Sequence, residues 1–168
     1  QIVLIAFFMA TFIEGAAGFG TPAAVVAPLL LGLGFPALAA VIAGIIGHII
    51  AVTYGVVGTP IVVGIQSPME SVEFTRTAIE GGGMIVQEFS VNVAAWAATY
   101  HALIGFVMPL FAVGMVVYFF GDPDDRSLAP ALEVAPLCLA SGIAFAVPYW
   151  VSAWFLTAEF PSLIWSMV

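Results

Sequence analysis

The stretch Phe12-Ile-Glu-Gly-Ala-Ala-Gly-Phe-Gly-Thr-Pro22 organises this chain, because it places one carboxylate and several small residues inside an otherwise apolar sequence. Loops that face water are usually polar, and this one is not. Its glycines allow the backbone to turn, and Thr21-Pro22 is a typical start for a helix. The stretch therefore predicts a turn between two apolar helices, at a depth where water is scarce.

The composition predicts an all-α polytopic membrane protein. Hydrophobic residues make up 63% of the 168 residues and charged residues only 7%, whereas soluble domains are about a quarter charged. A soluble fold would lack the polar surface needed to cover such a core. With 2 Lys+Arg against 10 Asp+Glu, the chain has no basic face for nucleic acid. Both ends lie in apolar runs, so we expect an internal piece of a longer chain.

Residues 1–35 are expected to form a re-entrant helical hairpin. Residues 1–13 are apolar and helical in character, and the run Pro22–Leu33 beyond the turn has 12 residues, or about 18 Å of helix. A full membrane span needs around 20 residues, so this second arm reaches only part of the way across. The run Gly32-Leu-Gly-Phe-Pro36 marks its end with glycine and a helix-stopping proline.

Residues 36–66 predict a broken transmembrane helix. This apolar run is too long for one straight span, and Tyr54-Gly-Val-Val-Gly-Thr-Pro60 interrupts it. We expect a helix over 37–53, an unwound middle and a half-helix over 60–66. Such interruptions are tolerated in lipid where the freed backbone groups face protein or a watery cavity, and they point to binding sites.

The triplet Gly-Thr-Pro occurs at 20–22 and again at 58–60. In each copy glycine permits a turn, the threonine hydroxyl is expected to cap the helix, and proline fits the first helical position. Each copy therefore predicts a half-helix N-terminus at membrane depth, whose free N–H groups favour an anion. The alternative is a pair of ordinary capped helix starts at the surface. We assign substrate binding to residues at and beside the two copies: Gly18, Gly20, Thr21, Tyr54, Gly58, Thr59 and Gln66.

Glu14 and His48 are the candidate proton-coupling residues. Glu14 is the only acidic residue before Gln66, and a charge in mid-membrane costs on the order of 3 kcal/mol or more unless it is paired, protonated or facing water. Burial favours the protonated form of a carboxyl group, which suits a proton carrier. Alternatively, Glu14 only accepts hydrogen bonds from amides of its own loop. His48 either passes protons near neutral pH or is simply hydrogen-bonded between packed helices.

The rest of the chain predicts one interfacial segment and two further spans. Residues 67–99 begin with the capping-box pattern Ser67-Pro-Met-Glu70 and continue through a charged amphipathic helix over about 68–80. Polar residues within 84–99 indicate a helix that lies on the membrane surface and leads into the next span. We expect the two spans over 100–120 and 133–157, and the start of a further helix over 161–168.

Enzyme chemistry finds little support in the sequence. Gly15-Ala-Ala-Gly-Phe-Gly20 has a superficial likeness to a nucleotide loop, but no strand precedes it and no Gly-Lys-Ser/Thr follows. No Cys/His cluster has the spacing of metal ligands. We therefore expect no enzymatic activity, no catalytic residue, no cofactor and no metal.

Three segments closely resemble the lactate permease family of prokaryotic membrane transporters: Phe12-Ile-Glu-Gly-Ala-Ala-Gly-Phe-Gly-Thr-Pro-Ala23, Leu30-Leu-Gly-Leu-Gly-Phe35 and Gly55-Val-Val-Gly-Thr-Pro-Ile61. Ala158-Glu-Phe-Pro-Ser-Leu163 is also similar to that family. The resemblance implies a multi-pass plasma-membrane protein built from two inverted repeats, each with a re-entrant hairpin and a broken helix, as in other ion transporters of the same superfamily. The chain departs from the family pattern at His48, where the resemblance implies asparagine.

The resemblance also implies a function, which is proton-coupled symport of L-lactate and related 2-hydroxy monocarboxylates such as D-lactate and glycolate. The expected partners are the monocarboxylate, protons, the lipid bilayer and the remainder of the same full-length chain. Two other hypotheses stay open at this point. One is a Na⁺-coupled organic-anion carrier or a cation/proton antiporter with the same fold. The other is a structural subunit of a membrane complex that transports nothing alone.

Overall fold

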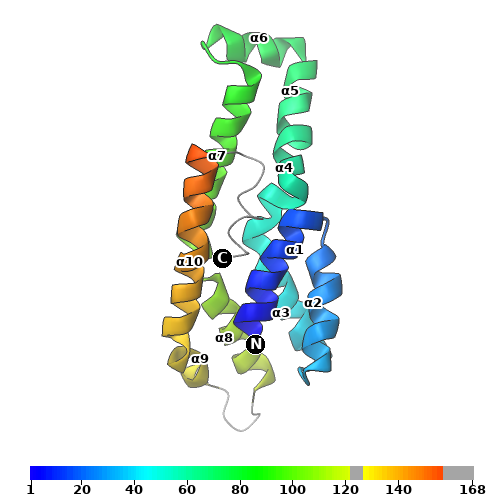
Figure 1. The fold of residues 1–168 in the computed structure, drawn as a ribbon, viewed down its shortest axis with the longest axis vertical. Helices are drawn as coiled ribbons and strands as arrows, with labels where there is room; N and C mark the ends of the chain where they lie inside the picture. The colour runs from blue at the N-terminus through cyan, green and yellow to red at the C-terminus, as the bar shows by residue number, and fades with distance from the viewer. Residues whose placement is uncertain (122–126, 157–168) are drawn as a thin grey trace.

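The computed structural model describes residues 1–121 and 127–156, and every regular element in these two ranges is helical. The predicted all-α class is therefore confirmed. Figure 1 shows an elongated bundle whose longest helices run along its axis. In chain order the elements are η1 (Val3–Met9), α1 (Ala10–Ala17), α2 (Thr21–Gly32), α3 (Ala37–His48), η2 (Ile49–Tyr54), α4 (Gly55–Ile61), η3 (Val62–Gln66), α5 (Ser67–Ser71), α6 (Glu73–Gly81), α7 (Val86–Gly105), α8 (Met108–Phe120), α9 (Ala129–Glu133) and α10 (Ala135–Phe155).

The first three elements form a helical hairpin, with η1 and α1 as one arm and α2 as the other (Figure 1). Residues 18–20 make the tip, and all three have positive φ. The tip lies near the middle of the long axis, against α4 (Figure 1). As the glycine-rich run predicts, α2 ends at Gly32, and Gly34 follows with a φ of 93°. Its N–H then donates to the carbonyl of Leu31, which closes the helix end.

The long apolar run after the hairpin is helical, with a break at residues 56–58. The α3 helix tightens into the 3₁₀ segment η2, and then Val56, Val57 and Gly58 all take left-handed φ values. Beyond them the chain is helical again from Thr59 through α4, η3 and α5. The helix therefore runs past residue 66 to Ser71, so the predicted cap at Ser67 is wrong. The hydroxyl of Ser67 instead donates to the carbonyl of Val62 within the continuing helix.

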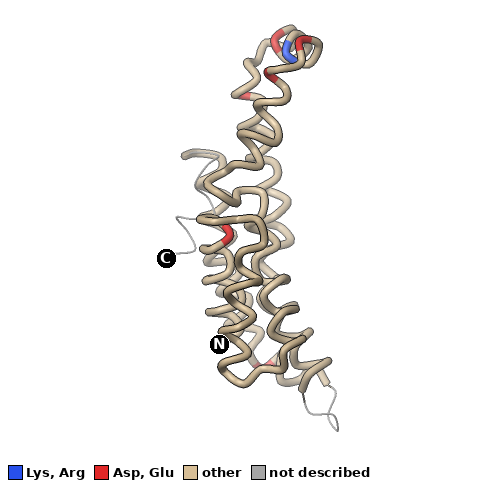
Figure 2. Tube along the Cα trace, turned by 90° about the vertical axis from the view of Figure 1, so that its right-hand side faces the viewer, with Lys and Arg blue, Asp and Glu red and all other residues tan. Residues whose placement is uncertain are grey.

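Charged residues gather at the end of the bundle formed by α5 and α6, where Figure 2 shows both signs together. The α6 helix lies across this end (Figure 1) and leaves its residues largely exposed. It corresponds to the amphipathic helix expected over 68–80, but it begins only at Glu73, because Val72 has an extended backbone.

The structure differs from the prediction between residues 84 and 105. The surface helix expected over 84–99 and the start of the span at residue 100 are one continuous helix, α7, which runs along the bundle (Figure 1). Its polar residues are satisfied locally, since Glu88 accepts the N–H of Ile85 at 3.3 Å and Ser90 donates to the carbonyl of Gln87. The expected span over 100–120 bends by 43° between α7 and α8, where Pro109 supplies no backbone N–H.

Within the part of the chain that the structure describes, two helices are long and apolar enough to cross a membrane, namely Ala37–Ser71, which contains the break, and Ala135–Phe155. The bent pair α7 and α8 makes a third if it is counted as one span. The observed α10 lies within the span predicted over 133–157. The helix expected over 161–168 lies outside the described residues.

Small residues allow the helices to approach closely at two crossings. A Cβ at Gly47 of α3 would overlap the carbonyl oxygen of Ala6 in η1, and a Cβ at Gly142 of α10 would overlap that of Phe106. In both places main-chain atoms occupy the space. Such contacts are typical between membrane helices, where van der Waals packing contributes more than the hydrophobic effect.

Buried tyrosines connect α7 and α10 to the segment just before the break. The hydroxyl of Tyr149 donates to the carbonyl of Ile50 at 3.0 Å and lies 3.2 Å from Nδ1 of His101. The hydroxyl of Tyr54 donates to the carbonyl of Ala94 at 2.6 Å. The two tyrosine rings meet edge to face. The Tyr149 side chain of α10 thus donates to the Ile50 carbonyl of the irregular η2 segment, whereas an apolar side chain could not.

Replacing Tyr149 by phenylalanine is expected to destabilise the full-length protein by about 1 kcal/mol, because the buried Ile50 carbonyl loses its donor. The measurement is the melting temperature of the detergent-purified protein. Tyr100→Phe is the matched control, since Tyr100 is 60% exposed. Equal melting temperatures for Tyr149→Phe and wild type would contradict this role of the hydroxyl group.

Candidate functional site

The two Gly-Thr-Pro triplets adopt the same backbone geometry. Gly20 has φ 77° and ψ 7°, and Gly58 has φ 78° and ψ 11°. Each glycine ends a run of three residues with positive φ, and each is followed directly by a helix. The repeated sequence therefore produces a repeated structure, in which a left-handed turn leads into a helix.

The predicted hydroxyl caps are wrong in both copies. The cap residue of α2 is Gly20, and no side chain makes a hydrogen bond there. Thr21 is already the first residue of that helix. The hydroxyl of Thr59 instead donates to the carbonyl of Val56 at 2.6 Å. Its hydrogen bond therefore stabilises the left-handed turn and not the helix start.

The hairpin tip packs directly against the break. A Cβ at Gly18 would overlap the side chain of Val56, and a Cβ at Gly55 would lie 2.9 Å from Oε1 of Glu14. Glycine at both positions thus permits a close approach between two turns that lie more than thirty residues apart in the sequence. The two irregular segments therefore face each other in the structure.

A cavity of about 490 Å³ opens where the tip meets the break. Its polar side chains come from both segments, with Glu14 from the hairpin and His48 and Thr59 from the broken helix, and Gly20 of the hairpin tip lines it as well. The remaining lining residues are apolar or glycine: Gly18, Phe19, Val52, Gly55, Val56, Pro60, Val63 and Gly64.

Glu14 and His48 form a pair at this cavity. Nε2 of His48 lies 3.9 Å from Oε2 of Glu14, and only 2% of the Glu14 surface is exposed. Oε2 has no hydrogen-bond partner among the described residues. Nδ1 of His48 lies 2.6 Å from the carbonyl oxygen of Gly44. Because a carbonyl oxygen only accepts, Nδ1 carries the hydrogen, and Nε2 is left to face Glu14.

The structure brings together five of the nine residues assigned from the sequence, which are Glu14, Gly18, Gly20, His48 and Thr59. The other four do not line the cavity. Thr21 begins α2, Gly58 is buried within the break, and the Tyr54 hydroxyl is bonded to Ala94. Nε2 of Gln66 donates to Oε1 of Glu70 at 2.9 Å, near the charged end of the bundle. The functional roles of all nine residues stay predictions.

Sequence reasoning missed the apolar part of the lining. Val63 lies four residues after Thr59, and Gly64 lies four residues after Pro60, so helical spacing places each on the face of a lining residue. Phe19 was flanked by two glycines in the opening stretch, which indicates an exposed position at the tip. It is 87% exposed, with a φ of 51°. Val52 carries no comparable signal, because its position depends on the 3₁₀ winding of η2.

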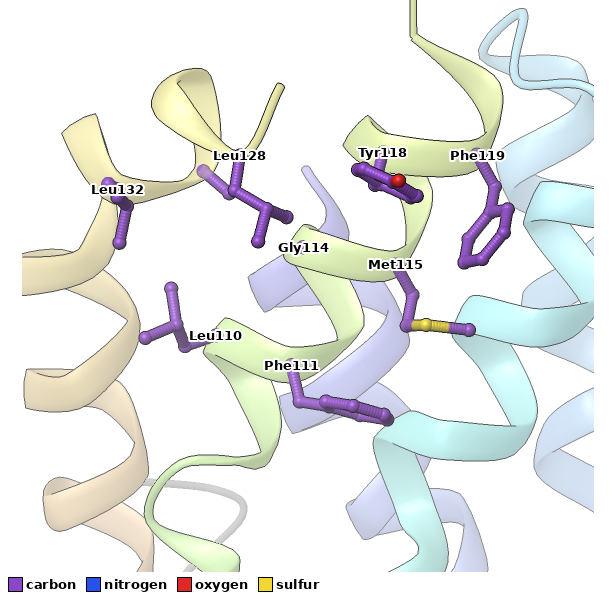
Figure 3. A pocket seen from close by; sticks show the side chains of 9 residues that line it. Leu110, Phe111, Gly114, Met115, Tyr118, Phe119, Leu128 and Leu132 are labelled. Carbon is purple, nitrogen blue, oxygen red and sulfur yellow. The ribbon is translucent and has the colours of Figure 1, made fainter. Parts of the chain in front are cut away.

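A second cavity, of about 380 Å³, lies between α8 and α9. Figure 3 shows Leu110, Leu128 and Leu132 beside one another there, with the aromatic ring of Phe111 at the other side. Its lining contains no charged residue, and Tyr118 supplies the only side-chain oxygen. A carboxylate would find no partner for its charge in this cavity, so the cavity at the hairpin tip is the better candidate for an anion.

Comparison with known protein families gives a match over the full length of the chain. The family model described as L-lactate permease matches residues 1–168. The chain belongs to the L-lactate permease family. Its members are membrane permeases, which are transporters and not enzymes. No solved structure matches the chain.

Curated members of the L-lactate permease family from several bacteria resemble the chain along its whole length. It is 34% identical over 169 residues to an L-lactate permease of Bacillus subtilis, covering 100% of this chain and 25% of the relative. It is 30% identical over 165 residues to a putative L-lactate permease of Haemophilus influenzae, covering 98% and 26%. A glycolate permease of Escherichia coli is 27% identical over 168 residues, covering 100% and 25%. The chain thus spans about a quarter of the length of these relatives.

Proposed function

We propose that the full-length protein carries L-lactate and related 2-hydroxy monocarboxylates across the prokaryotic plasma membrane together with protons. The observation that carries this proposal is the cavity at which a buried carboxyl group and a histidine meet two helix starts. Membership of the L-lactate permease family supports the substrate class, since its relatives include lactate and glycolate permeases.

The proposal requires the hairpin to be re-entrant, so that its tip lies inside the membrane. Its arms are short apolar helices, Val3–Ala17 and Thr21–Gly32, and the neighbouring Ala37–Ser71 is long enough to cross. The tip packs against the break of that helix, so the proposal puts both left-handed turns at the same depth in the membrane. A second, inverted copy of this unit would lie in the remainder of the protein and would face the open side of the cavity.

Protons suit this site because Glu14 has a buried oxygen with no partner among the described residues. A carboxylate in that position is stabilised by gaining a proton or a cationic neighbour. His48 can supply the cationic neighbour when its ring is protonated. Alternatively, Glu14 can take up a proton from water. The positive end of the α2 dipole adds a favourable local field for the substrate's carboxylate. The N–H groups of Thr21 and Ala23 at this helix start already donate to the carbonyls of Gly18 and Gly20.

Uptake of labelled L-lactate by vesicles that contain the full-length protein tests the proposal. We expect accumulation above the equilibrium level when the outside is acidic, and no accumulation when only a Na⁺ gradient is imposed. Unlabelled glycolate and D-lactate should compete, whereas propionate, which lacks the 2-hydroxyl group, should compete less well. Accumulation driven by Na⁺ alone, or no flux under either gradient, would refute proton-coupled symport.

A further inference from the structure

The source of positive charge at the cavity is the question that the proposed function leaves open. A monocarboxylate brings one negative charge, and the sequence contains no lysine. Arg76 is the arginine that the structure describes, and it lies exposed on α6 at the charged end of the bundle. Among the residues that line the cavity, only His48 can become a cation.

The orientation of His48 prepares one ring nitrogen for this role. Nδ1 is held by the carbonyl of Gly44 at 2.6 Å, so its hydrogen is committed to its own helix. His48 and Glu14 both line the cavity, and Nε2 of His48 lies 3.9 Å from Oε2 of Glu14. That separation is within the range of an ion pair but longer than a hydrogen bond. Both atoms therefore remain available to a third polar group.

The two side chains can share protons without interference from other ionisable groups nearby. The helices that pack on α1 and α3 carry Tyr54 and Tyr118 as their other titratable side chains in the described part of the chain. The hydroxyl of Tyr54 is bonded to Ala94, and Tyr118 is exposed on α8. Glu14 and His48 thus form an isolated pair in the described structure.

Counting charges then gives two states of this pair that differ by one proton. With one proton between Oε2 and Nε2, the pair is neutral overall, whichever atom holds it. With a second proton, Glu14 is a carboxylic acid, His48 is an imidazolium, and the pair carries one positive charge. A bound monocarboxylate cancels that charge. Since uncompensated charge is costly in apolar surroundings, the anion and the second proton favour each other's binding.

We propose that Nε2–H of the His48 imidazolium binds the carboxylate of the transported acid once a second proton has neutralised Glu14. This inference rests on the proposed function and adds the residue that holds the substrate. The entering proton goes to Oε2 of Glu14, and the proton on Nε2 is then donated to a substrate oxygen in place of Glu14. One monocarboxylate therefore enters with one proton, and the occupied and empty sites are both neutral.

The test uses the full-length protein in proteoliposomes, with labelled L-lactate uptake measured between pH 5 and pH 8. For wild type, the KM for L-lactate should rise as the pH rises, because the cationic state of the pair becomes rare. His48→Gln keeps a neutral N–H donor but cannot carry charge. It should raise the KM at pH 5 about tenfold or more and should remove most of its pH dependence.

His101→Gln is the matched control, because His101 contacts Tyr149 and does not line the cavity. It should keep the pH dependence of the wild-type KM. Suppose that folded His48→Gln keeps the wild-type KM and its pH dependence, while wild-type uptake is driven by protons. This result would overturn the role of His48 and leave the proposed function standing. Absence of proton-driven uptake in wild type would overturn both.

A second measurement needs no variant and so does not depend on whether His48→Gln folds. If the site is neutral in both states, net uptake by wild type should not respond to an imposed membrane potential when the pH is equal on both sides. Uptake that a potential accelerates severalfold would show that net charge crosses the membrane with each anion, and it would overturn the one-proton inference.

Discussion

Replacing Glu14 by glutamine is expected to abolish the accumulation of L-lactate against its gradient, lowering the ratio of internal to external substrate to about 1. Glutamine has nearly the same shape as a protonated glutamate, but it cannot take up or release the proton that coupling requires. Exchange of labelled for unlabelled lactate needs no net proton movement, so it should persist. The two assays on the same vesicles separate coupling from binding.

Glu73→Gln provides the control for this experiment, because Glu73 lies exposed on α6, away from the cavity. It should accumulate lactate like wild type. If Glu14→Gln accumulates lactate against its gradient as well as wild type and Glu73→Gln do, Glu14 has no part in the coupling mechanism. The hydrogen-bonding alternative, in which the carboxyl group only accepts hydrogen bonds from amides of its own loop, would then be the better account of this residue.

Replacing Gly47 by alanine is expected to prevent most of the full-length protein from folding. The new Cβ would occupy the position of the Ala6 carbonyl oxygen and lie 3.2 Å from the Phe7 nitrogen. Because these are main-chain atoms, the contact can be relieved only by moving α3 away from η1. We expect a loss of about 3 kcal/mol or more in stability, and therefore little monodisperse protein after extraction.

Gly32→Ala is the matched control, since a Cβ at Gly32 would have no neighbour within 4 Å. Size-exclusion profiles and melting temperatures of tagged protein in detergent measure the outcome. Gly32→Ala should behave like wild type or melt slightly higher, because alanine favours the helix. A normal profile for Gly47→Ala would mean that η1 and α3 cross less closely than the structure has them.

The hairpin and the broken helix could be predicted because their signals are local. A Gly-Thr-Pro triplet inside an apolar run has few structural uses, and its two copies fold alike at Gly20 and Gly58. The buried position of Glu14 also followed from its isolation in the sequence. The pairing of its oxygen with Nε2 of His48 could not be predicted, because it depends on how α1 crosses α3.

The errors arose where polar side chains find partners within their own helix. Glu88 and Ser90 suggested a helix at the membrane surface, but both bond to backbone within one turn and remain in a long helix along the bundle. Ser67 suggested a new helix start for the same reason. A sequence pattern lists donors and acceptors, whereas the partner that each one chooses is a three-dimensional property.

The left-handed turn at Gly20 has a consequence for chirality. A Cβ there would meet no atom within 4 Å, so space does not limit this position, and only its φ of 77° does. An L-alanine would therefore cost about 1 to 2 kcal/mol. D-alanine has the same atoms in mirror image and suits a positive φ, so at this position it would stiffen the tip without strain. At position 20 the handedness of the backbone alone therefore decides between L-alanine, which would be strained, and D-alanine, which would not.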